Sequence, residues 1–283
     1  MQPELIETFL DLVESRSFHR TAERQGLTQS TVSGRVRALE AALGVRLFSR
    51  SRAGTHLTTE GLKFEPHARA LRHAWAEAKR SVEQTGAQAV TLRIGIQNDL
   101  AAGHIGDWIA GFRRALPQAG FYIEPDYSAQ MCADLATGLL DFAVLFTPRA
   151  TPDLHFSTVG QVSYRLISSD GARRDGLRAD RFIRANYSPA FGLAHRATLP
   201  EMEAAPLAAG QNAAVAGLLQ SIGGAGFVLQ DTAQALVATG NFHLVTDVAP
   251  LTQPVYAAMH LRHRTSALHR RLLKIVERQL GRR

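Results

Sequence analysis

A polar row between residues 29 and 37 contains the side chains best suited to chemistry. Gln29 opens the run QSTVSGRVR, and its amide can pair bidentately with adenine. Thr31 and Arg35 follow on the same helical face, and a guanidinium suits guanine. The side chains suited to phosphate contact are Ser30, Ser33, Arg37, Arg50 and Arg52. This pattern predicts contact with double-stranded DNA, although any single one of these residues could instead be a solvated surface residue.

Two short helices joined by a tight turn would position this row. In FHRTAERQ, Phe18 and Ala22 are apolar at helical spacing, and Gly26 ends the run. Leu27 anchors the turn. Thr28 stands at an N-cap position, where its hydroxyl can accept from a free N–H of the next helix.

The second helix carries an apolar stripe opposite the polar row. Its four members, spaced by four, three and four residues, are Val32, Val36, Leu39 and Leu43. We expect them to pack on the first helix and on an upstream apolar set, Leu5, Phe9, Leu12 and Val13. The run SRSRAGTHL would add a short hairpin in which Gly54 permits the turn.

Positive charge is concentrated in the same region. Only Glu23 and Glu40 oppose the eight arginines between residues 16 and 58, which are Arg16, Arg20, Arg24, Arg35, Arg37, Arg46, Arg50 and Arg52. The whole chain has a net charge of +7 and a pI near 10.1. Such a balance favours a polyanionic partner, although a basic, solvated helical bundle would share it.

These motifs together resemble a known family. TAERQGLTQSTVSGRVRALEAALGVRLFSR, followed by LTTEG, is similar to the winged helix-turn-helix of LysR-type transcriptional regulators over about residues 4–64. FEPHA, Trp75, RADRFIRANYSPAF and QPVYA are similar to the HdfR branch of that family. The resemblance implies a homodimer or homotetramer with a C-terminal effector-sensing domain, and its partners would be DNA, a small-molecule effector and RNA polymerase.

Two positions depart from the family pattern. Ser30 stands where many members have proline, and Gly34 stands mid-helix where a larger polar residue is usual. Glycine inside a helix costs about 0.5–1 kcal/mol relative to alanine.

A long amphipathic helix is expected after the winged unit, which we place at residues 1–58, with the linker helix at 59–88. Apolar residues recur at steps of four and three along it, at Phe64, Ala68, Leu71, Trp75, Ala78 and Val82. This spacing is typical of a coiled-coil seam and predicts pairing with a second copy, although packing on the downstream domain would also cover it. Pro66 should bend this helix or begin a segment of it.

Residues 85–90 form a polar hinge, and beyond it short apolar strands alternate with helices. This alternation predicts an α/β domain with a largely parallel sheet over residues 89–283. The resemblance implies two lobes, as in periplasmic solute-binding proteins: lobe I at about 91–161 and 265–283, and lobe II at about 162–264. The fold class is therefore α+β multi-domain, with a winged helix-turn-helix, a linker helix and a two-lobed α/β domain.

Effector candidates come from the ends of strands, where open α/β sheets bind ligands. They are Gln97, Asn98, Asp99 and Leu100 after LRIGI, Phe146 and Thr147 at the crossover, and Asn186, Tyr187 and Ser188 from the other lobe. Asp99 is expected to cap a helix rather than to contact ligand. An acidic side chain here would disfavour an anionic effector.

Several classes of function lack their sequence signals. Cys132 is the only cysteine and is expected to be a small buried residue. His260, His263 and His269 lack any accompanying metal motif and are interpreted as part of a basic surface, so no metal or cofactor is expected. GGAG at 223–226 is expected to permit close helix–strand packing. No paired catalytic carboxylates or nucleophile motif is present, and no export signal or membrane span, so a cytoplasmic, non-enzymatic protein is expected.

The sequence therefore predicts a DNA-binding transcriptional regulator controlled by an effector. Three alternatives stay open: an architectural or constitutive DNA-binding protein without an effector, a DNA-binding module fused to an enzyme, and a solute-binding receptor.

Overall fold

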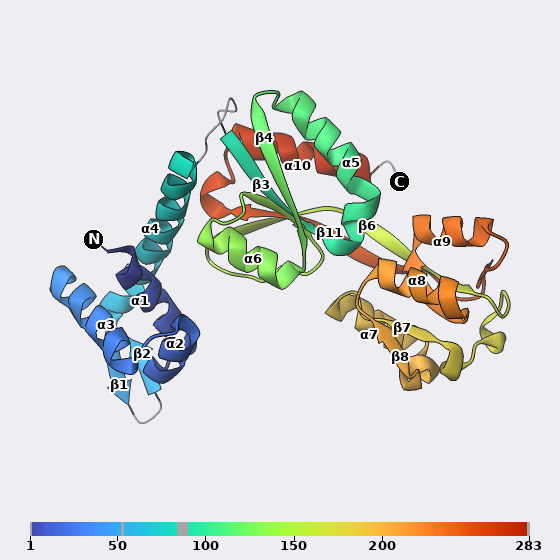
Figure 1. The fold of residues 1–283 in the computed structure, drawn as a ribbon, viewed down its shortest axis with the longest axis horizontal. Coiled ribbons are helices and arrows are strands. Elements are labelled where there is room, and N and C mark those ends of the chain that lie inside the picture. Colours follow the sequence, from blue (N-terminus) through green and yellow to red (C-terminus); the bar gives the residue numbers. More distant parts are fainter. Residues whose placement is uncertain (1, 52–53, 84–89, 282–283) are drawn as a thin grey trace. The chain divides into compact units, whose positions relative to one another are not determined.

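The computed structural model describes residues 2–51, 54–83 and 90–281 (Figure 1). The chain divides into two compact units. One comprises residues 1–90 with 134–139, and the other comprises 91–133 with 140–283. We call them the winged unit and the regulatory unit. The expected hinge at 85–90 lies outside the described residues except for Val90.

The winged unit has the predicted order of elements. Its helices and strands are α1 (Pro3–Ser15), α2 (Phe18–Gln25), α3 (Gln29–Leu43), β1 (Phe48–Ser51), β2 (Gly54–Leu57) and α4 (Thr59–Glu83). Left-handed glycines end α2 and α3, with φ of 63° at Gly26 and 72° at Gly44. The strands β1 and β2 pair antiparallel, with Phe48 opposite Leu57. Pro66 lies inside α4 and does not begin it.

The core of the winged unit confirms most of the predicted stripe on α3. Val32, Val36 and Leu39 are buried in one cluster with Phe9 and its neighbours. Leu43 was expected there and is 40% exposed instead. It is the last residue of α3, directly before Gly44, and lies outside the apolar cluster formed by the described residues.

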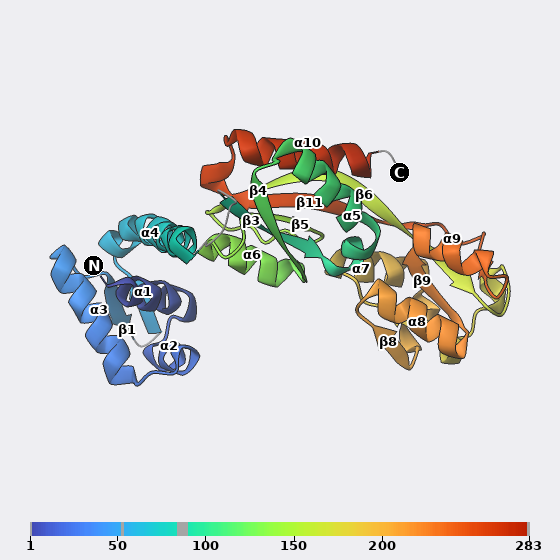
Figure 2. The ribbon, with the colours of Figure 1, turned by 45° about the horizontal axis from the view of Figure 1, so that its top comes forward.

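The regulatory unit is built on one mixed seven-stranded sheet (Figures 1 and 2). Its order is β10-β6-β11-β5-β3-β4, with β9 pairing on β6. The strands are β3 (Val90–Gln97), β4 (Ala119–Asp126), β5 (Phe142–Leu145), β6 (Leu154–Ser168), β9 (Ala225–Leu229), β10 (His243–Leu244) and β11 (Leu251–His260). A separate parallel pair is formed by β7 (Ile183–Ala185) and β8 (Leu207–Ala209).

The expectation of a largely parallel sheet was wrong. Although β3 and β5 are parallel, β6 pairs antiparallel with β9, β10 and β11, and β11 pairs antiparallel with β5. The two long strands cause this difference, because β6 and β11 run side by side in opposite directions from Leu154 to Tyr164 and from His260 to Leu251.

Helices cover both faces of the sheet around β3. The helices that follow in the chain are α5 (Asn98–Ala115), α6 (Ser128–Thr137), α7 (Pro189–Thr198), α8 (Asn212–Ile222), α9 (Gln230–Ala238) and α10 (Ala267–Leu280). All belong to the regulatory unit, except that residues 134–137 of α6 group with the winged unit. The helices α5 and α10 pack together on one face, and α6 lies on the other (Figures 1 and 2). The helix α5 begins at Asn98, so the candidate effector residues 98–100 form its first turn.

Two apolar cores divide the regulatory unit. One joins β3, β5, α5 and α10 around Trp108 and Phe112, and the other surrounds Tyr164, Phe191 and Phe227. The limits of the two lobes at residues 162 and 264 stay predictions. Four short turns of 3-10 helix, at 174–176, 179–181, 200–204 and 261–263, complete the described elements.

Glycines 223–226 have the packing role expected of them. Gly223 and Gly224 have φ of 69° and 95°, and a Cβ on Gly224 would lie 2.1 Å from the carbonyl oxygen of Arg181. Any side chain there would displace the neighbouring backbone.

No helix in the described ranges is both long and apolar enough to cross a bilayer.

Candidate nucleic-acid interface and effector cleft

The start of α3 is held by a hydroxyl cluster. Thr28 is the N-cap, as predicted, and its Oγ1 accepts from the backbone N–H of Thr31 at 3.2 Å. The same oxygen lies 2.8 Å from the Thr31 hydroxyl and 2.9 Å from that of Ser30. The first turn is thereby fixed while its side chains stay at the surface.

The predicted DNA-contacting residues differ in exposure. Those that are exposed are Gln29, Ser30, Thr31 and Arg37, and those that are half-buried are Ser33 and Arg35. The Nε of Arg37 donates to the carbonyl of Ser33 at 3.3 Å, which aligns the guanidinium along the helix. The side chain of Arg50 and the whole of Arg52 lie outside the described residues.

Arg35 points back into the winged unit. Its Nη1 donates to the hydroxyl of Thr8 at 3.2 Å, and that hydroxyl donates to Oε1 of Gln25 at 3.0 Å. The amide of Gln25 donates to the carbonyl of Glu7 at 3.3 Å. This chain of contacts joins α1, α2 and α3, so in this structure Arg35 holds the recognition helix in place.

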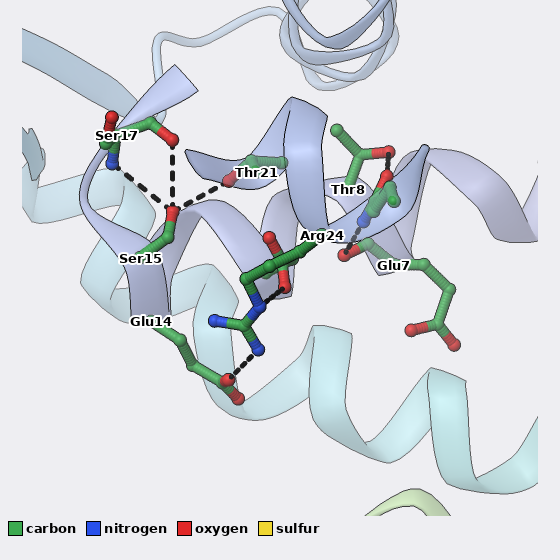
Figure 3. A network of polar contacts seen from close by, with 9 residues as sticks. Glu7, Thr8, Glu14, Ser15, Ser17, Thr21 and Arg24 are labelled. Carbon is green, nitrogen blue, oxygen red and sulfur yellow. Dashed lines mark hydrogen bonds and ion pairs between the residues drawn. The ribbon is translucent and has the colours of Figure 1, made fainter. Parts of the chain in front are cut away.

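A second polar network fixes α2 on α1 (Figure 3). Arg24 pairs with Asp11 at 3.0 Å and with Glu14 at 3.2 Å. The hydroxyl of Ser15 lies 2.7 Å from that of buried Thr21 and also donates to the carbonyl of Ser17. Arg24 is thus one of the eight arginines already neutralised by the protein.

Glu40 attaches the wing to α3. Its Oε1 accepts from the backbone N–H groups of Leu47 and Phe48, at 2.7 and 3.2 Å. We missed Glu40 and Thr8 as positioning residues in the sequence. The LE pair before LGVRLF was the available signal for Glu40, whereas nothing near Thr8 indicates its partners.

The helix α4 divides the predicted seam into two parts. Ala68 is completely buried, and Phe64 packs edge-on against Phe9 with ring centroids 5.2 Å apart. Ala68 therefore belongs to the core of the winged unit and has no surface left for a partner helix, which corrects the prediction. The rest of the seam, Leu71, Trp75, Ala78 and Val82, is exposed.

In the regulatory unit, a buried hydroxyl joins three predicted effector residues. Ser128 donates to Oε1 of Gln97 at 2.7 Å and accepts from the N–H groups of Phe146 and Thr147, at 3.2 and 3.1 Å. These residues follow β3, β4 and β5, so the expected meeting of strand ends occurs. Ser128 itself was missed, although its place just after a strand was a usable signal.

A buried amide connects this cluster to Ser188. Gln253 of β11 accepts from the Ser188 hydroxyl and donates to the carbonyls of Phe146 and Pro254 at 3.4 and 3.0 Å. Ser188 also caps α7 by accepting from Phe191 N–H at 3.0 Å. Gln253 is 1% exposed, and although it begins the QPVYA motif, it was not predicted as a site residue.

Three other candidates are not brought into this cluster. Leu100 is part of the apolar core around Trp108. The Tyr187 hydroxyl donates to the carbonyl of Phe227 at 2.6 Å. Asn186 is exposed, with its backbone N–H bonded to Ala209. The side chain of Tyr187 is therefore committed to its own core.

Asp99 caps a helix, but not its own. Its Oδ1 accepts from the backbone N–H of Asn212 at 2.7 Å, at the start of α8, while Gln97 is the N-cap of α5. Burial raises the pKa of the Asp99 carboxyl from 3.8 to about 6, and the Asn212 N–H offsets part of that effect.

The remaining titratable candidates are structural. Cys132 is buried, as expected, and burial raises the pKa of its thiol. His260 and His269 were expected at the surface and are buried instead, with the His269 ring stacked on His263 at 4.5 Å. No group of His, Cys, Asp and Glu suited to a metal ion occurs in the described chain.

A winged helix-turn-helix followed by a two-cored α/β unit defines a class of one-component DNA-binding regulators. Residues 3–62 match the model of the bacterial regulatory helix-turn-helix protein, lysR family, and residues 85–281 match the LysR substrate binding domain. The chain belongs to the LysR family: it is a DNA-binding transcriptional regulator with an effector-binding domain and not an enzyme.

Individual relatives agree with this assignment. The chain is 30% identical over 261 residues to the HTH-type transcriptional regulator HdfR of Salmonella typhimurium strain LT2, with 91% of each chain covered. It shares the fold of full-length LysG from Corynebacterium glutamicum with bound effector Arg, at 19% identity and a TM-score of 0.55, over 100% of this chain and 99% of that one. ArgP from Mycobacterium tuberculosis is similar at 20% identity and a TM-score of 0.55, over 98% and 96%.

Proposed function

We propose that this regulator binds an inverted-repeat operator as a dimer or a dimer of dimers, with Gln29 and Thr31 at base edges. The two faces of α3 carry the proposal. One face is buried through Val32, Val36 and Leu39, while the first turn presents a capped, exposed polar surface. A helix of this kind enters the major groove with its N-terminal residues nearest the bases.

In this proposal the arginines divide into two roles. Arg37 is exposed and contacts phosphate, together with Arg50 and Arg52. Arg35 could contact guanine only if its hydrogen bond to the Thr8 hydroxyl were broken first. Its present contact supports a positioning role, in which it keeps α3 at a fixed angle to α1.

Dimerisation would use the exposed part of α4. Leu71, Trp75, Ala78 and Val82 remain at steps of four and three. The first three border a groove of about 270 Å³ against Pro3 and Ile6 of the winged unit. A second α4 covering this stripe would bury the exposed half of the Trp75 ring. Two recognition helices related by a two-fold axis would then match an inverted repeat.

A small-molecule effector in the regulatory unit would change the placement of the two DNA-binding heads. LysG was solved with such an effector, Arg, and shares this fold. One observation favours a second candidate, an effector-independent regulator: the polar groups of Gln97, Ser128 and Gln253 already have hydrogen-bond partners within the protein. Contact with chromosomal DNA would place the protein in the cytoplasm, where RNA polymerase is a further candidate partner.

The first experiment is equilibrium binding of the full chain to the DNA directly upstream of its own gene, with random duplex as competitor. We expect specific binding whose affinity falls about a hundredfold or more between 50 and 200 mM salt, because several phosphates are neutralised. Footprinting should protect two half-sites. Equal affinity for the random duplex would refute the proposal.

The second experiment measures oligomeric state. Trp75→Glu places a charge in the exposed stripe without touching the buried Ala68, and we expect the dimer to dissociate at micromolar concentration in sedimentation. Val45→Glu is the matched control, because Val45 is exposed to a similar degree but lies outside α4. A wild-type monomer would count against the dimeric part of the proposal.

A further inference from the structure

A pocket of about 140 Å³ lies beside Asp99, on a side that the strand-end cluster does not use. Its polar lining includes His104 of α5, Ser163 of β6 and Asp231 and Thr232 of α9, and Leu280 of α10 adds an apolar wall. A cavity of about this volume holds a ligand of roughly six heavy atoms. Of the residues predicted for the effector, Asp99 alone lines it.

The charge of this lining is one-sided. Asp99 and Asp231 contribute carboxylates, and the described residues that line the pocket include no lysine or arginine. An anionic ligand would meet the like charge of Asp99 here. A divalent metal ion is equally unsuited, because no group of metal-ligating side chains is found in the described chain.

Asp99 is a buried acid without a countercharge. It is 8% exposed, and the bond from Asn212 N–H is the only hydrogen bond that its carboxylate accepts within the described chain. No Lys or Arg of the described residues offsets the loss of hydration, and burial is the largest influence on the pKa of Asp99. A buried carboxylate is costly unless a cation or several donors satisfy it, so this position is set up for a partner that the chain does not provide.

The other surfaces of the cleft offer less to a ligand. Gln97, Ser128, Ser188 and Gln253 are buried, with Ser128 bonded to Gln97 and Ser188 bonded to Gln253. A ligand entering there would have to break these contacts, whereas the pocket beside Asp99 is open.

We propose that the pocket beside Asp99 binds a small organic cation, an ammonium or guanidinium group on a short apolar chain. The cationic head lies against the Asp99 carboxylate, with Asp231 nearby, while the chain packs towards Leu280. The site borders both lobes, since Asp99 belongs to α5 and its partner Asn212 begins α8. Only the description of this ligand as an effector rests on the proposed function.

Three probes of equal length test the charge requirement: n-butylammonium, n-butanol and butyrate, each titrated into the full-length protein by calorimetry at pH 7.5 and constant ionic strength. We expect n-butylammonium to bind at least tenfold more tightly than n-butanol, and butyrate not to bind. Equal binding of the first two, or no binding of n-butylammonium, would overturn the proposal.

Two variants test the location. Asp99→Asn keeps an acceptor for Asn212 N–H but removes the charge, so n-butylammonium should lose at least tenfold in affinity. Ala102→Leu fills the pocket from an exposed position on α5 and should weaken binding without removing any charge. Asp175→Asn, an exposed acid outside the pocket, is the control. Wild-type affinity in both pocket variants would place the cation elsewhere and refute the site.

The pH dependence provides a further readout. Because the pKa of Asp99 is about 6, n-butylammonium should bind about tenfold more weakly at pH 5 than at pH 7.5. His104 and Asp231 also face the pocket, and Tyr164 and Tyr187 interact electrostatically with Asp99. Any pH dependence of n-butylammonium affinity that remains in Asp99→Asn comes from these other groups. A pH dependence as large as that of the wild type would contradict the role of Asp99.

A separate measurement keeps this site distinct from the proposed function. DNA affinity is titrated by fluorescence polarisation with and without n-butylammonium. A cation that binds but leaves DNA affinity unchanged would count against effector control and leave the site intact. Loss of specific DNA binding in all conditions would count against the proposed operator contacts alone.

Discussion

The first turn of α3 and the cleft at the ends of β3, β4 and β5 are both rich in amides and hydroxyls, yet they treat these groups in opposite ways. In the first turn of α3, Gln29 and Thr31 are exposed, and the Thr28 hydroxyl accepts from the backbone N–H of Thr31. In the cleft, Ser128 and Gln253 are buried and fully engaged with neighbouring polar groups.

This difference indicates how each region meets its partner. The exposed side chain of Gln29 makes no hydrogen bond within the described chain, so it can contact a base without first losing one, and its substitution should change binding and leave stability alone. A buried, bonded side chain stabilises the fold first, and a ligand must compensate for every contact that it displaces. Asp99 stands between these cases, since it is buried but only partly satisfied.

The largest expected effect is on the stability of Asp99→Asn. The folded chain holds the Asp99 proton more tightly than the unfolded chain, because burial raises its pKa from 3.8 to about 6. The stability that this proton provides is present below pH 3.8 and is lost as the pH rises through about 6. Asp99→Asn should therefore exceed the wild type by about 3 kcal/mol at pH 7.5 and by about half of that at pH 5.

Urea unfolding of both proteins at the two pH values checks this prediction. Burial lowers the pKa values of His195 and His269, so both histidines destabilise the folded protein as the pH falls below 6.5. Their contributions to the free energy of unfolding are the same in both proteins and cancel in the difference. If the difference in the free energy of unfolding did not depend on pH, other groups in the folded protein would have to offset the cost of burying the ionised Asp99 carboxylate.

Gln253→Ala should destabilise the regulatory unit by about 2–3 kcal/mol. It removes three hydrogen bonds, leaves the Phe146 carbonyl without its donor, and opens a small cavity. Gln234→Ala, at an exposed position on α9, is the matched control and should stay within about 0.5 kcal/mol of the wild type. Similar denaturation midpoints for the two variants would remove the contrast between cleft and surface.

The same contrast explains what could be predicted from the sequence. The turn before α3 depends on Gly26 and Thr28, whose caps act within a few residues, so the local pattern was sufficient. The cleft depends on pairs such as Ser128 with Gln97 and Gln253 with Ser188, which are 31 and 65 residues apart. No local pattern identifies such partners.

Periodicity also has a limit that α4 illustrates. Steps of four and three identified an apolar stripe correctly, but they cannot distinguish a partner helix from the protein's own core. Ala68 therefore proved to face that core, whereas Trp75 remains exposed. In the sheet, the alternation of strands and helices suggested parallel pairing. That pattern carries no information about the direction of a strand that returns between lobes, and β11 returns antiparallel along β6.

Gln29→Ala tests the exposed side of the comparison. We expect operator affinity to fall by about 2 kcal/mol, roughly thirtyfold, because a bidentate base contact is lost. Stability should change by less than about 0.5 kcal/mol, since the side chain is exposed. Polarisation titrations and urea unfolding measure the two quantities, and a loss of stability matching the loss of affinity would show that Gln29 supports the fold instead.

The smallest expected effect, and the sharpest test of the α3 surface, is Gly34→Ala. A Cβ at Gly34 would meet nothing within 4 Å, so alanine should raise the unfolding free energy by about 0.5–1 kcal/mol through helix propensity alone. Gly106 and Gly217 are also helical glycines with open space around them, and alanine there should bring a similar gain. Only the variant at Gly34 should also change operator affinity, because its new methyl group would face DNA. If all three variants gained stability and none altered DNA binding, the absence of a side chain at Gly34 would have no part in recognition.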